Sequence, residues 1–93
     1  VEKDPLDGES VLILADYFGR NENAEKAELF YQRAAQLDGF EVRAKISHAQ
    51  FHVLRDAYHK AIPLLREAQL KRPRNNVQLY LDKVEKLAKL KTN

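Results

Sequence analysis

The chain shows a helical pattern of hydrophobic and polar positions along most of its length. Apolar residues recur every three or four positions, the spacing that places them on one face of an α-helix. No stretch alternates convincingly in the way that a half-buried strand does. We therefore expect an all-α fold. The five predicted helices cover residues 9–20, 24–37, 42–54, 57–71 and 76–91.

Short polar breaks separate the predicted helices. These breaks are Asn21-Glu22-Asn23, Asp38-Gly39, Arg55-Asp56 and Arg72-Pro73-Arg74-Asn75. Their Asn and Asp residues are of the type that caps the helix that follows. Because connections of this length force neighbouring helices to be antiparallel, the chain is predicted to form antiparallel helix pairs.

A period of 34 residues relates the two halves of the chain. The matching pairs are Ala15 and Ala49, Ala27 and Ala61, Ala34 and Ala68, Leu12 and Ile46, Tyr17 and Phe51, and Gly39 and Pro73. The alanines occupy equivalent positions in the two halves. Small side chains suit the points at which two helices cross closely. A fixed period of this length is typical of helical repeat proteins.

At these positions the sequence resembles the tetratricopeptide repeat (TPR) family, whose repeat reads W-x2-L-G-x2-Y, then A-x3-F, then A and P. The matching residues of the first repeat are Val11, Leu14, Ala15, Phe18, Ala27, Tyr31, Ala34 and Gly39. Those of the second repeat are Ala49, Ala61, Leu65, Ala68 and Pro73. The resemblance implies a right-handed superhelical array of antiparallel helix pairs.

The repeat boundaries give one TPR-like domain over residues 1–93. Residues 8–41 and 42–75 form two repeats, and residues 76–93 form a C-terminal capping helix whose apolar face covers the last pair. Residues 1–7 resemble the tail of a preceding repeat, because Asp4-Pro5 stands 34 residues before Asp38-Gly39. We therefore expect that the chain is an excised part of a longer protein.

The resemblance also implies a function, because the family binds a peptide or partner helix on a concave face lined by the first helix of each pair. The matching residues here are Leu12, Asp16, Arg20, Arg43, Ile46, Gln50, Val53, Tyr80 and Val84. The Lys and Asn with which some members clamp a terminal carboxylate are absent from this face. We expect a protein–protein interaction module, a scaffold or adaptor, that binds a protein or peptide.

Two alternatives for the same face stay open. Its apolar residues could pack against the chain's own neighbouring helices. A second copy of the chain could also fill the face, which would make the chain a homodimer or a structural spacer.

His48 and His52 stand where the family carries apolar or aromatic residues, and they lie four residues apart on one helical face. That spacing is used by metal-binding helices. The stretch lacks the glutamate of a metalloprotease helix, the chain has no cysteine, and a third ligand could come only from His59 or a carboxylate. We therefore expect structural packing and no metal site, with a pH-sensitive contact as the alternative.

The sequence does not indicate catalysis. The only serines and threonine are Ser10, Ser47 and Thr92, and no glycine-rich phosphate loop occurs. Ser47 and His48 are sequence neighbours, whose side chains diverge on a helix. We expect no enzyme activity, no catalytic residue and no cofactor.

Composition excludes further classes of partner. Sixteen basic and fourteen acidic residues give a net charge of +2, which is too balanced for a nucleic-acid-binding field. We interpret the basic residues of 71–74 and 83–91 as solvated surface. No apolar run is long enough to cross a bilayer. We expect a soluble domain without nucleic-acid binding or membrane insertion, with the cytoplasm slightly favoured.

Overall fold

The computed structural model describes residues 7–92, which form five helices and no strand. The helices are α1 (Gly8–Arg20), α2 (Ala24–Ala35), α3 (Glu41–Leu54), α4 (Tyr58–Lys71) and α5 (Asn75–Thr92). The prediction of an all-α chain is confirmed, and each predicted helix end lies within two residues of the observed one. The expected tail of a preceding repeat lies outside the described residues, apart from Asp7.

The predicted caps are confirmed before α2 and wrong before α3 and α4, and α3 begins after Phe40 without a side-chain cap. The Asn23 side chain accepts a hydrogen bond of 3.4 Å from the backbone N–H of Lys26 and so caps α2. Asp56 does not cap α4, which begins after Ala57 without a side-chain cap. Asp56 has a positive φ of 60° and accepts a hydrogen bond from the Tyr58 hydroxyl instead. The tight turn therefore leaves its carboxylate outside the capping position.

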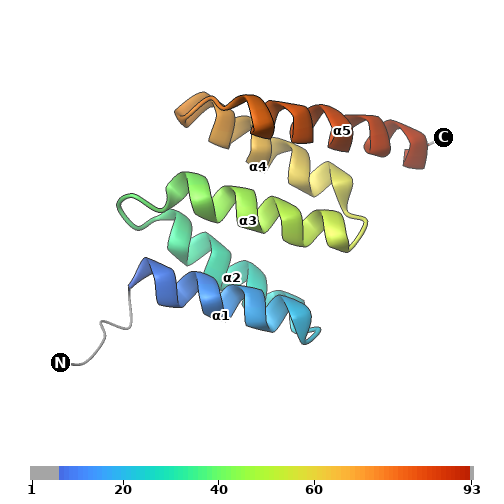
Figure 1. Ribbon diagram of the computed structural model, residues 1–93. Helices are drawn as coiled ribbons and strands as arrows, with labels where there is room; N and C mark the ends of the chain where they lie inside the picture. The colour runs from blue at the N-terminus through green and yellow to red at the C-terminus, as the bar shows by residue number, and fades with distance from the viewer. Residues whose placement is uncertain (1–6, 93) are drawn as a thin grey trace.

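The helices form two layers, with α1, α3 and α5 in one and α2 and α4 in the other (Figure 1). Each helix packs against the next one along the chain, and α1 also contacts α3. The Cα positions extend over 52 × 30 × 16 Å. The result is an elongated slab in which every helix keeps a long face near the surface.

Two hydrophobic cores hold the helices together. The first joins α1, α2 and α3 and contains Val11, Leu12, Ala15, Ala27, Tyr31, Ala34, Ala44 and Phe51. The second joins α3, α4 and α5 and contains Ala49, Ala61, Leu65, Val77, Leu81 and Val84. The six alanines of the 34-residue register are all at most 1% exposed, as close helix crossings require.

Candidate functional site

A hollow of about 240 Å³ lies between α1 and α3, with a contribution from α2. Its lining combines apolar side chains with polar and charged ones: Asp16, Gly19, Arg20, Tyr31, Ser47, Gln50, Phe51, Leu54 and Arg55. We call it the α1–α3 groove. Leu54 is 86% exposed at this place, so the groove offers an apolar contact that the chain itself does not cover.

Three of the nine predicted partner-binding residues meet in the α1–α3 groove. Asp16 and Arg20 come from α1, and Gln50 comes from α3. Arg20 and Gln50 are exposed, whereas Asp16 is half-buried. Their helices are neighbours in one layer, so these three side chains line the same hollow.

The apolar members of the predicted face lie mostly inside the chain. Leu12 and Val84 are only 4% and 1% exposed, in the first and second core respectively. Ile46, Val53 and Tyr80 are partly buried against the second core. The alternative in which this face packs against neighbouring helices therefore holds for Leu12 and Val84, whose side chains are closed to a partner.

The ninth predicted residue, Arg43, forms an exposed ion pair with Glu9. Its two guanidinium nitrogens donate hydrogen bonds of 2.8 and 3.0 Å to the two oxygens of that carboxylate. The pair joins α3 to α1 across the same layer. Arg43 therefore contributes to helix packing, although it remains exposed.

Tyr31 links the groove to the interior. Its side chain is 3% exposed, and its hydroxyl donates a hydrogen bond to Asp16 Oδ1. Burial raises the pKa of Tyr31, and the hydrogen bond and negative charge of Asp16 raise it further. The carboxylate of Asp16 is thus held by α2, and Arg20 and Arg55 supply positive charge at the same groove.

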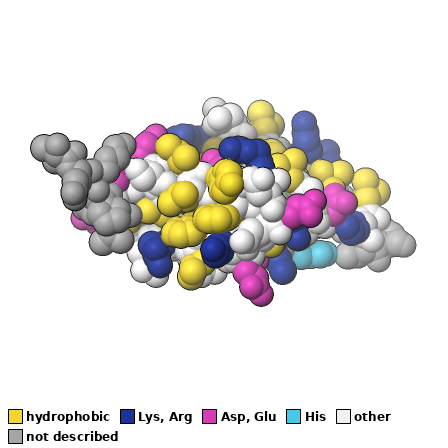
Figure 2. Space-filling view, turned by 90° about the horizontal axis from the view of Figure 1, so that it is seen from below, with side chains coloured by type: hydrophobic (Ala, Val, Ile, Leu, Met, Phe, Trp, Pro, Cys, Tyr) yellow, Lys and Arg dark blue, Asp and Glu magenta, His cyan; other side chains and the backbone are white. Residues whose placement is uncertain are grey.

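A second exposed surface is apolar. Ile13, Leu14 and Tyr17 of α1 are 62%, 42% and 52% exposed, and Leu29 of α2 is 52% exposed. Figure 2, which views the molecule from the α1 side, shows hydrophobic side chains gathered in the middle of this face. We call these four residues the α1 end patch. Residues 13, 14 and 17 share one side of the helix because of its period of 3.6 residues.

A buried polar cluster lies where α2 crosses α3. His48 and His52, one helical turn apart on α3, are only 6% and 4% exposed. Their Nε2 atoms lie 3.6 and 3.8 Å from Oε1 of Glu28 on α2. The two imidazole rings stack with centroids 4.6 Å apart, and Tyr31 stacks on His48. We call Glu28, His48 and His52 the α2–α3 cluster.

Burial keeps both histidines of the cluster neutral at pH 7. It lowers the pKa of His48, and the charge of Glu28 only partly opposes this shift. Burial and, next, the neighbouring His48 lower the pKa of His52 to about 4. The contacts with Glu28 are therefore not ion pairs at neutral pH, and they are too long for good hydrogen bonds.

The sequence predicts that the two histidines pack inside the chain, but it does not predict Glu28 beside them. The burial of His48 and His52 agrees with the predicted structural packing. Glu28 stands 20 residues before His48, on a different helix of a different pair. The 34-residue register offers a signal, because Ile62, the residue equivalent to Glu28, packs against the core that α4 shares with α5.

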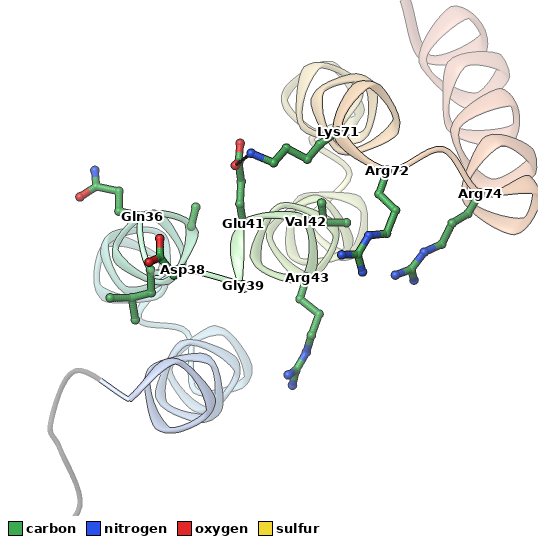
Figure 3. A pocket seen from close by; sticks show the side chains of 11 residues that line it. Gln36, Asp38, Gly39, Glu41, Val42, Arg43, Lys71, Arg72 and Arg74 are labelled. Carbon is green, nitrogen blue, oxygen red and sulfur yellow. Dashed lines mark ion pairs between the residues drawn. The ribbon is translucent and has the colours of Figure 1, made fainter.

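A second hollow, of about 310 Å³, lies where the loops after α2 and α4 meet the start of α3. Lys71 pairs with Glu41 at 3.0 Å. Figure 3 shows that Arg43, Arg72 and Arg74 extend to one side of these helix ends, away from that pair. Arg72 and Arg74 are exposed, which agrees with the interpretation of this segment as solvated surface.

Within residues 7–92, none of the helices combines the length and the apolar character that a membrane span requires. Comparison of the chain with models of protein families, with curated proteins and with solved structures found no match.

Proposed function

We propose that the chain is a protein–protein interaction module that binds a peptide in the α1–α3 groove. In this proposal the helices form a TPR-type, right-handed superhelical array, and the groove is part of its concave face. The observation that carries the proposal is the meeting of Asp16, Arg20 and Gln50 beside the exposed side chain of Leu54. An apolar surface with a small number of polar groups beside it is typical of binding sites, because the polar groups fix the orientation of the ligand.

Two features support the array. Two-layer stacking with contacts between consecutive helices is the arrangement that antiparallel pairs joined by short loops produce. The alanines that recur every 34 residues are buried at the crossings. Both features fit a repeat architecture, in which each pair presents one helix to a continuous surface.

The chemistry of the groove indicates the kind of peptide it binds. Leu54 and the buried ring of Phe51 favour an apolar side chain, while Arg20 and Arg55 favour a carboxylate beside it. The Arg55 guanidinium lies over the Phe51 ring, 5.5 Å from its centroid, so charge and apolar surface are adjacent. We infer a peptide with one apolar and one acidic residue close together in sequence.

The expected affinity is modest. Burying one apolar side chain yields about 1.5–3 kcal/mol. Association costs about 4–15 kcal/mol, so a groove with one apolar anchor holds a peptide weakly unless the charged contacts add to it. Further repeats in a longer protein would strengthen binding by lengthening the surface.

The proposal is tested by selecting peptides from a random display library on the chain and measuring binding of the synthetic consensus peptide by fluorescence anisotropy. We expect the consensus to pair an apolar residue with Asp or Glu. Leu54→Lys and Arg55→Glu should each weaken binding by about tenfold, the effect of losing 1.4 kcal/mol.

Leu70→Lys is the matched control, because Leu70 is also 86% exposed but lies on α4, outside the groove. It should leave the affinity unchanged. Selection of no binding peptide, or equal losses in Leu54→Lys and Leu70→Lys, would contradict the proposal.

The α1 end patch favours a second candidate function, assembly of the chain through self-association. Ile13, Leu14 and Tyr17 on one side of α1 are 62%, 42% and 52% exposed. An exposed apolar patch of this kind is typical of a surface that a partner covers. Light scattering over a range of concentrations tests it. Ile13→Glu should abolish a dimer, whereas Leu79→Glu, a similarly exposed site on α5, should not. A native chain that stays monomeric would exclude this candidate.

A further inference from the structure

The α2–α3 cluster has the composition of a metal site. Two imidazole nitrogens and one carboxylate oxygen lie within 4.8 Å of one another. Two histidines and one glutamate are a donor set that binds Zn²⁺ in proteins. The three side chains come from helices of two different pairs, so the fold itself brings them together.

The distances leave room for an ion among these atoms. In tetrahedral coordination with bonds of 2.0–2.1 Å, ligand atoms stand about 3.3 Å apart. The observed separations of 3.6 and 3.8 Å between Glu28 Oε1 and the two Nε2 atoms are only slightly longer. The Glu28 side chain is 37% exposed, so its carboxylate can move by the few tenths of an ångström that separate these two distances from about 3.3 Å.

His48 supplies an independent observation. Its side chain is 8% exposed, and its Nε2 is buried without a hydrogen-bond partner. A buried polar atom without a partner costs about 1–3 kcal/mol. Coordination of a cation by the Nε2 lone pair removes that cost, because the nitrogen then has a partner.

The surroundings hold the donors in place. The Tyr31 ring stacks on the His48 ring at 5.1 Å and 14°, and the His48 ring stacks in turn on His52. Arg55 and Lys60 place positive charge near His52 and oppose a cation, whereas the Glu28 carboxylate attracts it from a direct contact position. At closest range the negative charge therefore dominates.

We propose that Glu28, His48 and His52 form a Zn²⁺ site that joins α2 to α3. The ion has three protein ligands, and water occupies its fourth position. It links the two helix pairs across their crossing and stabilises the folded chain, because the unfolded chain does not hold the three donors together. This site is separate from the α1–α3 groove, and the two proposals stand or fall independently.

The test uses the chain without a polyhistidine tag and Zn²⁺ as the probe. Isothermal titration calorimetry should show one ion per chain with a dissociation constant in the micromolar range or below. At a hundred times that concentration, the melting temperature should rise by roughly 10 °C or more. In ¹⁵N NMR spectra of the native chain, the ring nitrogens of His48 and His52 should shift on addition of Zn²⁺, and those of His59 should not.

Two variants and a control separate this site from adventitious binding. Glu28→Gln keeps the shape of the side chain and removes its negative charge. His52→Gln removes one nitrogen donor. Each should weaken Zn²⁺ binding by about tenfold or more. His59→Gln alters the exposed histidine of α4 and should change nothing. Circular dichroism confirms that each variant is folded.

Three results would overturn the proposal. The first is no heat and no melting shift with Zn²⁺. The second is unchanged affinity in a folded Glu28→Gln chain. The third is an NMR response confined to His59, a measurement that needs no variant and stands even if His52→Gln does not fold.

Discussion

The two crossings between successive helix pairs occupy equivalent places but differ in chemistry. Where α4 packs against α5, the buried side chains are apolar, with Leu65 at 0% and Val84 at 1% exposure. Where α2 packs against α3, buried histidines face a glutamate. Because the helices follow one another in the same way at both crossings, the difference lies in side chains and not in the path of the backbone.

The 34-residue register pairs the residues of the two crossings. Tyr31 corresponds to Leu65, and Glu28 corresponds to Ile62. The apolar crossing gains free energy simply from burial. The polar crossing buries groups that need hydrogen-bond partners, and this burial costs stability. The comparison implies that α4–α5 depends on apolar burial, whereas α2–α3 combines part of the first core with the buried polar groups of the proposed Zn²⁺ site.

The largest expected effect comes from the apolar crossing. Leu65→Ala should lower the free energy of unfolding by about 2–5 kcal/mol, because it leaves a cavity in a fully buried place. Urea denaturation followed by circular dichroism measures the loss. Leu70→Ala, on the same helix but 86% exposed, should change it by less than about 0.5 kcal/mol. Similar values for the two variants would show that Leu65 is not part of a close-packed core.

The next effect is acid destabilisation of the polar crossing, measured with a chelator present so that only protons compete for the histidines. Burial lowers the pKa of His52 from 6.5 to about 4 in the folded chain. The unfolded chain therefore binds more protons between these values. The contribution of neutral His52 to the free energy of unfolding is fully present above pH 6.5. It is lost as the pH falls toward 4, and the loss is about 3 kcal/mol at most.

The charges around His52 modify this loss without reversing it. Glu28 on α2 favours the protonated form, whereas His48, Lys60 of α4 and Arg55 oppose it. Urea midpoints at pH 7.5 and pH 4.5 measure the change. His52→Phe, which places there the residue type found 34 positions earlier at Phe18, should flatten the dependence. An equally steep dependence in that variant would assign it to other groups.

A smaller change is expected from replacing the unpartnered histidine. His48→Leu introduces the residue type found 34 positions earlier at Leu14 and removes a buried nitrogen without a partner. In metal-free buffer it should stabilise the chain by about 1–2 kcal/mol. Thermal and urea unfolding measure this gain. A loss of stability would mean that the imidazole is better satisfied than its contacts indicate.

Much of the fold could be predicted from the sequence because its signals are local. Helical periodicity and short polar breaks placed all five helices, since each signal extends over a few turns at most. The cap at Asp56 was wrong because the tight turn at this residue, and not its side-chain type, decides where α4 begins. Local sequence signals therefore predict that a helix forms more reliably than they predict its first residue.

The candidate sites were harder to predict because they depend on how faces meet. The sequence predicts Leu12 and Val84 on an open face. In the structure, neighbouring helices cover them, so Leu12 lies in the first core and Val84 in the second. Glu28 joins the histidines only through the packing of α2 on α3, a contact between helices of different pairs. Spacing within one helix identified His48 and His52, but it could not supply the third member.

The smallest expected effect comes from an exposed ion pair that spans the apolar crossing at its surface. Arg66 Nη2 of α4 lies 2.7 Å from Glu85 Oε2 of α5, with side chains 64% and 33% exposed. A double-mutant cycle with Arg66→Ala and Glu85→Ala should give a coupling of about 0.2–1 kcal/mol. Raising the salt concentration should reduce it, because exposed charges are screened. A coupling well above this range would mean that electrostatic attraction, and not apolar burial, is the main interaction between α4 and α5.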